Sequence, residues 1–214
     1  MVSDRHGAGT AGETPGMIRW CLHATPCGVL RLGAFGGRLC LCDWADVPAR
    51  DFVVRRLERG LHVRFAEWPN ERLRPGTGLP GIPAEPESNF PDNPDDADRC
   101  VLDRAARQFD EYFAGRRRVF DLPLLTVGTP FQRAVWELLT EIPFGETRSY
   151  AWLAAQLGHP RAVRAVAAAN RANALSIFIP CHRVVGSDGS LTGYAGGLAA
   201  KRLLLGLEQQ QLLR

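Results

Sequence analysis

From residue 129 onward the chain has the pattern of short helices separated by tight turns, which restricts this half to a compact helical unit. Thr129-Pro130 combines a good N-cap with a proline at the first helical position, so a helix is expected to begin there. The motif Ile142-Pro143-Phe144-Gly145 ends that helix, because proline and glycine disfavour its continuation. A last amphipathic helix is predicted over residues 196–208.

Two further helices are predicted between these elements. Ser149 is the expected N-cap of a helix over residues 150–157, and the turn Gly158-His159-Pro160 separates it from an alanine-rich helix over residues 161–171. The block between residues 147 and 187 holds no acidic residue but five arginines, namely Arg148, Arg161, Arg164, Arg171 and Arg183. A helix, a glycine-containing turn and a basic helix favour a helix-turn-helix DNA-binding unit, with a solvated basic surface as the alternative.

The first half of the chain has a different pattern. Residues 18–44 alternate between apolar and polar side chains and contain turn glycines, as expected of short antiparallel strands. Residues 68–98 hold seven of the fifteen prolines together with an acidic patch, which predicts a long surface loop. A helix is predicted over residues 100–114, and a further β segment over residues 119–125.

These patterns predict an α+β fold with two domains. Residues 17–121 would form an N-terminal α/β domain with a small antiparallel sheet and the proline-rich loop at about residues 69–98. Residues 122–214 would form a mostly helical C-terminal domain with a winged helix-turn-helix-like DNA-binding unit. Residues 1–16 contain no apolar segment, so they are expected to be a disordered leader rather than a signal peptide.

Composition argues against several classes of protein. No stretch approaches 18 consecutive apolar residues, so no membrane-spanning helix is expected. The six cysteines occur without a secretion signal, which favours reduced thiols and a cytoplasmic location. None of them forms a Cys-x-x-Cys pair, and no metal site is predicted. Cys40 and Cys42 flank Leu41, so both thiols are expected to be buried structural residues on one face of a sheet.

One cysteine has a chemically distinctive setting. In Ile179-Pro180-Cys181-His182-Arg183 the thiol follows an apolar run and lies beside an imidazole and a guanidinium. A thiol is a nucleophile only as the thiolate, and such neighbours favour that form, so a lowered pKa is expected for Cys181. From these residues alone, a buried structural cysteine is the alternative, because free cysteine is among the most buried residue types.

Many ordered matches show that the chain resembles the O6-alkylguanine–DNA alkyltransferases of the bacterial type, also called methylated-DNA–protein-cysteine methyltransferases. In the second half they are Gly128-Thr129-Pro130-Phe131-Gln132, Val135-Trp136, Ile142-Pro143, Gly145, Thr147, Ser149-Tyr150, Arg164-Ala165-Val166, Asn173, Pro180-Cys181-His182-Arg183-Val184, Gly193-Tyr194, Gly196-Gly197 and Leu207-Glu208. The first half matches more loosely, through Thr25-Pro26 with Gly28, Trp44 and Glu111-Tyr112-Phe113-Ala114-Gly115.

The resemblance implies an SN2 transfer of an alkyl group from guanine O6 to the sulfur of Cys181. In the family's relay a glutamate orients a histidine, and the histidine deprotonates the cysteine through a water molecule. These two roles fall on Glu208 and His182 in this sequence. Neighbouring residues of an extended chain point in opposite directions, which makes a bridging water more natural than a direct bond between Cys181 and His182.

Other residues take further roles from the resemblance. Tyr150 matches the phenol that donates a hydrogen bond to the base as charge develops. Asn173 matches the residue that ties the helix-turn-helix unit to the active-site loop, and with Tyr150 it completes the expected catalytic set. The expected substrate pocket consists of Val184, Ser187, Tyr194 and Gly196.

A base inside a duplex has to leave the stack before its O6 group can reach a buried thiol. Arg164 matches the arginine that fills the vacated stack from the minor groove. Arg161 lies one turn earlier on the predicted helix and is expected to contact a phosphate. The expected DNA-binding set is Arg161, Arg164, Ala165, Arg171, Arg183 and Tyr150.

The predicted partner is therefore double-stranded DNA carrying O6-alkylguanine, bound by a monomer. No cofactor is expected, since the alkyl group comes from the DNA and no glycine-rich loop for S-adenosylmethionine is present. Alternatives are a non-catalytic alkyltransferase-like damage-binding protein, in which the cysteine is replaced, and a helix-turn-helix regulator, whose relatives carry an added zinc-binding domain. A cysteine hydrolase is a further alternative, distinguished by a thiol that is regenerated.

Overall fold

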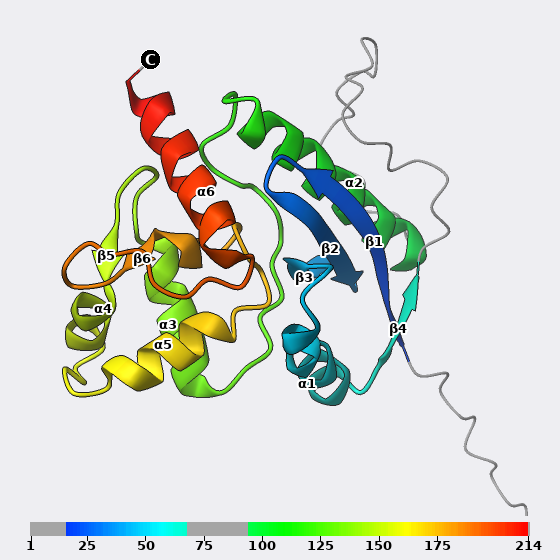
Figure 1. The fold of residues 1–214 in the computed structure, drawn as a ribbon. Coiled ribbons are helices and arrows are strands. Elements are labelled where there is room, and N and C mark those ends of the chain that lie inside the picture. Colours follow the sequence, from blue (N-terminus) through cyan, green and yellow to red (C-terminus); the bar gives the residue numbers. More distant parts are fainter. Residues whose placement is uncertain (1–15, 68–93, 214) are drawn as a thin grey trace, which may run out of the picture.

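The computed structural model describes residues 16–67 and 94–213 (Figure 1). The expected leader lies outside these residues except for residue 16, as does most of the proline-rich loop. The sheet and the helices of the first half form one side of the molecule. The helices of the second half form the other side. This arrangement confirms the predicted α+β class. The domain boundary near residue 121 stays a prediction.

The sheet has four strands in the order β3-β2-β1-β4. β1 (Met17–Thr25), β2 (Gly28–Phe35) and β3 (Arg38–Trp44) are antiparallel neighbours, as the alternation in the sequence predicted. β4 (Arg64–Glu67) runs parallel to β1, so the sheet is mixed rather than purely antiparallel. The chain reaches β4 from β3, which lies at the opposite edge of the sheet, so a crossover connects these two strands.

The crossover consists of η1 (Pro48–Arg50) and α1 (Asp51–Leu61), and α1 packs Val53 and Leu57 into a small apolar cluster with the sheet. α2 (Pro94–Phe113) packs against β1, β2 and β3 as part of the larger core. It begins six residues before the predicted start, so the end of the predicted loop is helical.

A bulge in β3 corrects the expectation that two thiols share a sheet face. In the pairing with β2, Gly33 lies opposite Leu41 and Ala34 opposite Leu39, which leaves Cys40 as an extra residue. A bulge breaks the alternation of side chains along a strand. Cys40 consequently packs in the cluster under α1, whereas Cys42 packs in the larger core with Leu175, Ile177 and Cys181.

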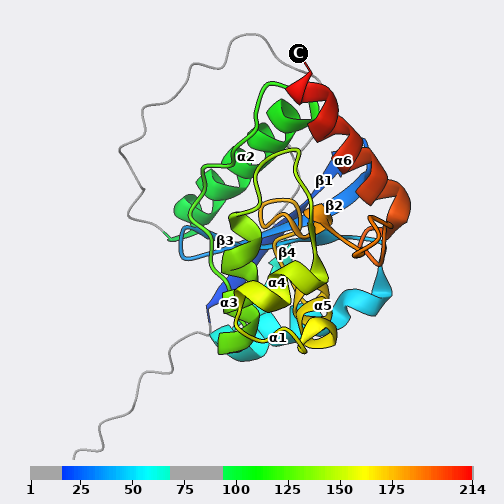
Figure 2. The same ribbon diagram turned by 90° about the vertical axis from the view of Figure 1, so that its left-hand side faces the viewer.

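The second half is helical, and its helices lie in front of the sheet in Figure 2. They are α3 (Pro130–Thr140), α4 (Tyr150–Gln156), α5 (Val163–Arg171) and α6 (Gly197–Leu212). α3 and α4 both pack against α5, which gives the predicted helix-turn-helix layout. Two short strands, β5 (Arg148–Ser149) and β6 (Val184–Val185), pair in parallel beside it.

Both N-caps that the sequence predicted are formed in the structure. Thr129 Oγ1 accepts from Gln132 N at 3.2 Å, and Gln132 Oε1 accepts from Thr129 N at 3.0 Å, which forms a capping box. Ser149 Oγ accepts from Trp152 N at 3.0 Å. Arg161, however, lies in the turn before α5 rather than on the helix, so it is not one helical turn from Arg164.

One apolar core joins the two halves of the chain. It contains Leu30 and Leu32 of the sheet, Trp136 and Leu139 of α3, and Cys181. The predicted β segment over residues 119–125 makes only an isolated bridge, in which Leu39 N donates to Pro123 O at 2.9 Å and Leu125 N donates to Leu39 O at 2.8 Å. This segment crosses from α2 to α3 along the free edge of β3.

Candidate active site

Cys181 begins the short helix η2 (Cys181–Arg183), directly after a buried loop that follows α5. Asn173 fixes this loop: its Nδ2 donates to Ile179 O at 2.9 Å, and its Oδ1 accepts from Leu175 N at 2.9 Å. The side chain is only 1% exposed. Asn173 therefore lies between α5 and the thiol and ties the loop between them in place.

Strand β3 holds the same loop from the other side. Cys42 N donates to Ala174 O at 2.7 Å, and Ser176 N donates to Cys42 O at 2.8 Å. Directly after Ser176, Ile177 has a φ of 74°, which costs a β-branched residue on the order of 1–2 kcal/mol. The sheet of the first half thus sets the path of the loop that carries the thiol.

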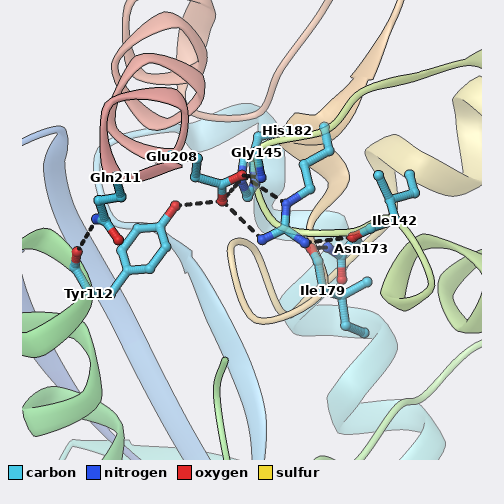
Figure 3. Close-up of polar contacts among 9 residues, drawn as sticks. Tyr112, Ile142, Gly145, Asn173, Ile179, His182, Glu208 and Gln211 are labelled. Atoms are coloured by element: carbon cyan, nitrogen blue, oxygen red, sulfur yellow. Dashed lines mark hydrogen bonds and ion pairs between the residues drawn. The ribbon is translucent and has the colours of Figure 1, made fainter. Parts of the chain in front are cut away.

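Glu208 of α6 is the centre of a buried polar network (Figure 3). Its Oε1 lies 2.9 Å from His182 Nε2, 2.8 Å from Tyr112 Oη and 3.0 Å from Arg183 Nη2. Its Oε2 accepts from Arg183 Nε and from Gly145 N, both at 3.0 Å. The predicted Glu208–His182 pair is therefore formed, with four further hydrogen bonds to Glu208 from three other residues.

Burial and the network together set the protonation of both partners. Burial alone would raise the pKa of Glu208, but the hydrogen bonds and charges of His182 and Arg183 outweigh it and lower the pKa to about 2. Burial lowers the pKa of His182, although Glu208 acts in the opposite direction. A neutral His182 that donates from Nε2 keeps Nδ1 as an acceptor, and this nitrogen has no partner among the described residues.

The expectation of a lowered pKa for Cys181 is wrong for the DNA-free protein. The thiol is 3% exposed, and burial raises its pKa. A hydrogen bond from Asn173 and the charges of Arg50 and Lys201 act against burial without cancelling it. Desolvation of the thiolate outweighs the neighbouring charges because the sulfur is fully enclosed.

A cavity of about 720 Å³ opens beside Cys181, between α5 and the segment that precedes α6. The site residues that the sequence predicted and that line this cavity are Cys181, Tyr150, Asn173, Tyr194, Arg164 and Arg171. Val163 and Ala167 of α5 and Val47 from the segment before η1 add apolar wall. The cavity is thus mostly apolar with a few polar groups, as expected of a site for a small molecule or a base.

Two tyrosines present phenols in this cavity. Burial raises the pKa of Tyr150, and the proximity of Cys181 raises it further, so the phenol is protonated near neutral pH. The Oη of Tyr194 is buried without a hydrogen-bond partner among the described residues. The Tyr194 ring packs edge-on against Trp44, with 5.8 Å between ring centroids, and lies 6.4 Å from the His182 ring.

The arginines and Ala165 of the expected DNA-binding set differ in exposure. Arg161, Arg164, Ala165 and Arg171 are exposed on or just before α5. Arg183 is not, because its guanidinium is paired with Glu208 and donates from Nη1 to Ile142 O at 2.7 Å. The expected DNA contact of Arg183 is therefore corrected to a buried role beside the relay.

Three predicted pocket residues do not line the cavity. Val184 is fully buried in β6, and Ser187 lies in the exposed turn after it. Gly196 packs against Trp44 so closely that a Cβ at this position would overlap the indole. These residues shape the surroundings of the cavity, and the structure does not place them in its wall.

An arginine of the first half reaches the site and was missed in the sequence. Arg50 is buried, and its Nε donates to Asp43 Oδ2 at 2.8 Å. Its Nη2 donates to Asn173 O at 2.6 Å, and its Nη1 donates to Arg171 O. Arg50 thus caps the carboxyl end of α5 and lines the cavity, with Asp43 as its buried counter-ion. No local pattern marks it, since both residues lie in the half that matches the family loosely.

Lys201 was also missed as a site residue, although it is the only lysine of the chain. It is fully buried in α6, and its Nζ donates to Val184 O at 2.5 Å and to Thr192 O at 2.8 Å. Burial lowers its pKa to about 8, against the opposing effect of Cys181. Lys201 fixes the segment before α6 to the strand that follows the thiol.

Within residues 16–67 and 94–213 no group of three or more His, Cys, Asp or Glu side chains is arranged to hold a metal ion. In the same part of the chain no helix is long and apolar enough to cross a membrane.

The fold and the site define a helix-turn-helix protein with a buried cysteine beside a glutamate–histidine pair, and several known proteins are similar to this chain. The family model described as "6-O-methylguanine DNA methyltransferase, DNA binding domain" matches residues 130–210. A methylated-DNA–protein-cysteine methyltransferase of Methanosarcina barkeri is 56% identical over 108 residues, which cover 50% of this chain and 68% of that protein. The constitutive enzyme of Bacillus subtilis is 55% identical over 109 residues, which cover 50% of this chain and 66% of that protein.

A solved structure extends the similarity to the first half. The crystal structure of Mycobacterium tuberculosis OGT in complex with DNA has a TM-score of 0.64 and 33% sequence identity, over 91% of this chain and 94% of that chain. The chain belongs to the methylated-DNA–protein-cysteine methyltransferase family. The resemblance found in the sequence and the expected enzyme class are thereby confirmed.

Proposed function

We propose that this protein repairs O6-alkylguanine in double-stranded DNA by moving the alkyl group irreversibly onto its own Cys181. The proposal depends on the position of this thiol. Cys181 lies in the wall of the 720 Å³ cavity, and the next residue, His182, is hydrogen-bonded to Glu208. A buried structural cysteine would have no need of either feature.

The transfer forms a bond between sulfur and the alkyl carbon and breaks the bond between that carbon and guanine O6. The leaving electron pair goes to the guanine, and the thiol proton passes through a water molecule to Nδ1 of His182. The guanine takes up one proton, so the net change is a proton moved from sulfur to base. The phenol of Tyr150, which lies in the same cavity, would hydrogen-bond the charge that develops on the base.

The protonation states in the free protein fit a thiol that is activated only during the reaction. Cys181 is protonated because burial raises its pKa, and His182 is neutral because burial lowers its pKa. A neutral imidazole is the form that can accept the thiol proton. The product is a thioether without a good leaving group, so each molecule reacts once.

Access to the site requires that the damaged nucleotide leave the duplex. The cavity borders the exposed side of α5, where Arg164 lies at its wall and is itself exposed. We assign Arg164 to the space that the base vacates, reached through the minor groove, and Arg161 and Arg171 to phosphates. On this proposal a monomer in the cytoplasm binds the DNA and needs no cofactor.

Stoichiometry tests the proposal. A duplex with one radiolabelled O6-methylguanine is titrated with protein, and label transferred to protein is counted. Transfer should end at one methyl group per molecule, be absent in Cys181→Ala, and be unchanged in Cys100→Ala, an exposed cysteine. More than one lesion repaired per molecule would contradict an irreversible transfer, and transfer by Cys181→Ala would contradict the choice of nucleophile.

A further inference from the structure

Tyr112 brings the first half of the chain into contact with the relay. It lies in the last turn of α2, is fully buried, and packs against Phe120 with 5.2 Å between ring centroids. Its hydroxyl donates to Glu208 Oε1 at 2.8 Å (Figure 3). Gln211 Nε2 donates to Tyr112 O at 3.1 Å and ties α6 to α2 at this point.

The Tyr112 hydroxyl shares its acceptor, Oε1 of Glu208, with Nε2 of His182. Oε1 of Glu208 lies within 3.0 Å of three donors, from Tyr112, His182 and Arg183, while Oε2 takes two. A carboxylate offers about four lone-pair positions, so five donors have to share them. A change in any one donor on Oε1 therefore alters the hydrogen bond that the same oxygen makes with His182.

We propose that Tyr112 is a positioning residue that limits the basicity of His182 by sharing Oε1 of Glu208. The proposal deepens the proposed alkyl transfer and rests on it for its role in the reaction. Because Tyr112 belongs to α2, the first half of the chain would tune the chemistry rather than only support the fold.

The direction of the effect follows from electrostatics. Without the Tyr112 hydroxyl, Oε1 has more electron density for the Nε2 proton of His182, so the protonated imidazole is stabilised and the pKa of His182 rises. The other groups that face the network are Arg183 of η2, Lys201 of α6, the phenol of Tyr194 before α6, and the thiols of Cys181 and Cys27, the last in the turn between β1 and β2. None of them is altered by Tyr112→Phe, so the shift in the His182 pKa belongs to the hydroxyl.

The test is the pH profile of single-turnover methyl transfer in wild type and in Tyr112→Phe, together with 15N NMR titration of the His182 ring. The acid limb of the profile should move to higher pH by about half a unit to one unit, a three- to tenfold gain in proton affinity. The NMR titration should move in the same direction. Incorporating 3,5-difluorotyrosine at position 112 keeps the hydroxyl and makes it a stronger donor, so both readouts should move to lower pH.

Phe120→Leu is the matched packing control, because it disturbs the ring next to Tyr112 without touching a donor. It should lower stability and leave the acid limb in place. An acid limb that is unchanged in Tyr112→Phe, or moved to lower pH, would overturn the proposal. The NMR titration needs no substrate, so a failure of wild type to transfer methyl would overturn the proposed function while Tyr112 is still tested.

Discussion

Replacing Glu208 by glutamine should destabilise the protein far more than its small change in shape suggests. Five donor contacts converge on the carboxylate, whereas an amide offers one acceptor oxygen and turns two N–H donors toward them. Arg183, 8% exposed, would lose its counter-ion. Removing one partner of a buried ion pair costs about 3–5 kcal/mol, a large part of a typical free energy of unfolding.

The pKa of Glu208 sets the pH dependence of this loss. The folded-state pKa is lowered from 4.5 to about 2, so the charge contributes about 3 kcal/mol at pH 7. A lowered pKa gives stability that is present above the unfolded-state value and lost as pH falls toward the folded-state value. Between pH 7 and pH 3.5 about 1.4 kcal/mol of this contribution should disappear.

Urea denaturation of wild type and Glu208→Gln at both pH values measures the difference. The free energies of unfolding should differ by about 3–5 kcal/mol at pH 7, and by about 1.4 kcal/mol less at pH 3.5. Glu141→Gln, an exposed glutamate at the end of α3, is the matched control and should change little at either pH. A difference below about 1 kcal/mol at pH 7, or one that does not decrease with pH, would refute this reasoning.

Three further variants test other parts of the structure. Arg164→Ala should slow transfer from methylated duplex DNA by about tenfold or more but leave alkyl transfer from free O6-benzylguanine within about twofold, because the free base needs no flipping. Equal losses in the two single-turnover rates would assign Arg164 to the fold. Arg50→Met should lower the free energy of unfolding, measured by urea denaturation, by about 3–5 kcal/mol, because it leaves Asp43 buried without its counter-ion. Adding Asp43→Leu should recover part of this loss, and additive losses would contradict a coupled pair. Gly145→Ala should lower both the melting temperature and the transfer rate, because Gly145 has a φ of 78°, its N–H donates to Glu208, and a Cβ there would overlap Leu212. Wild-type values for both would show that the turn can relax.

The sequence predicted those parts of the molecule that local patterns encode. The caps at Thr129 and Ser149 are short-range hydrogen-bonding motifs, and both are formed as expected. The contact between Glu208 and His182 could be predicted from the resemblance, because both residues lie in the strongly matching half. The prediction that Arg161 lies on the helix was wrong, because the turn Gly158-His159-Pro160 extends two residues further than its composition indicates.

The remainder depends on contacts between distant segments. Arg50 and Asn173 are far apart in the chain, and no local pattern could show that they share a hydrogen bond. Arg183 is buried because α6 brings Glu208 against it, and this contact is not visible in the sequence. The charge of Arg183 by itself therefore suggested a DNA contact. The direction of the Cys181 pKa shift was wrong for a related reason, since neighbours in sequence reveal charges but not the loss of solvent.

Intact mass and peptide mapping after reaction with a duplex carrying O6-methylguanine test the central claim most directly. The account predicts that the whole protein gains one methyl group, that the group lies on Cys181, and that the DNA regains unmodified guanine. The five other cysteines should carry none. An unmodified Cys181 after complete repair of the DNA, or a methyl group on another cysteine, would contradict the account.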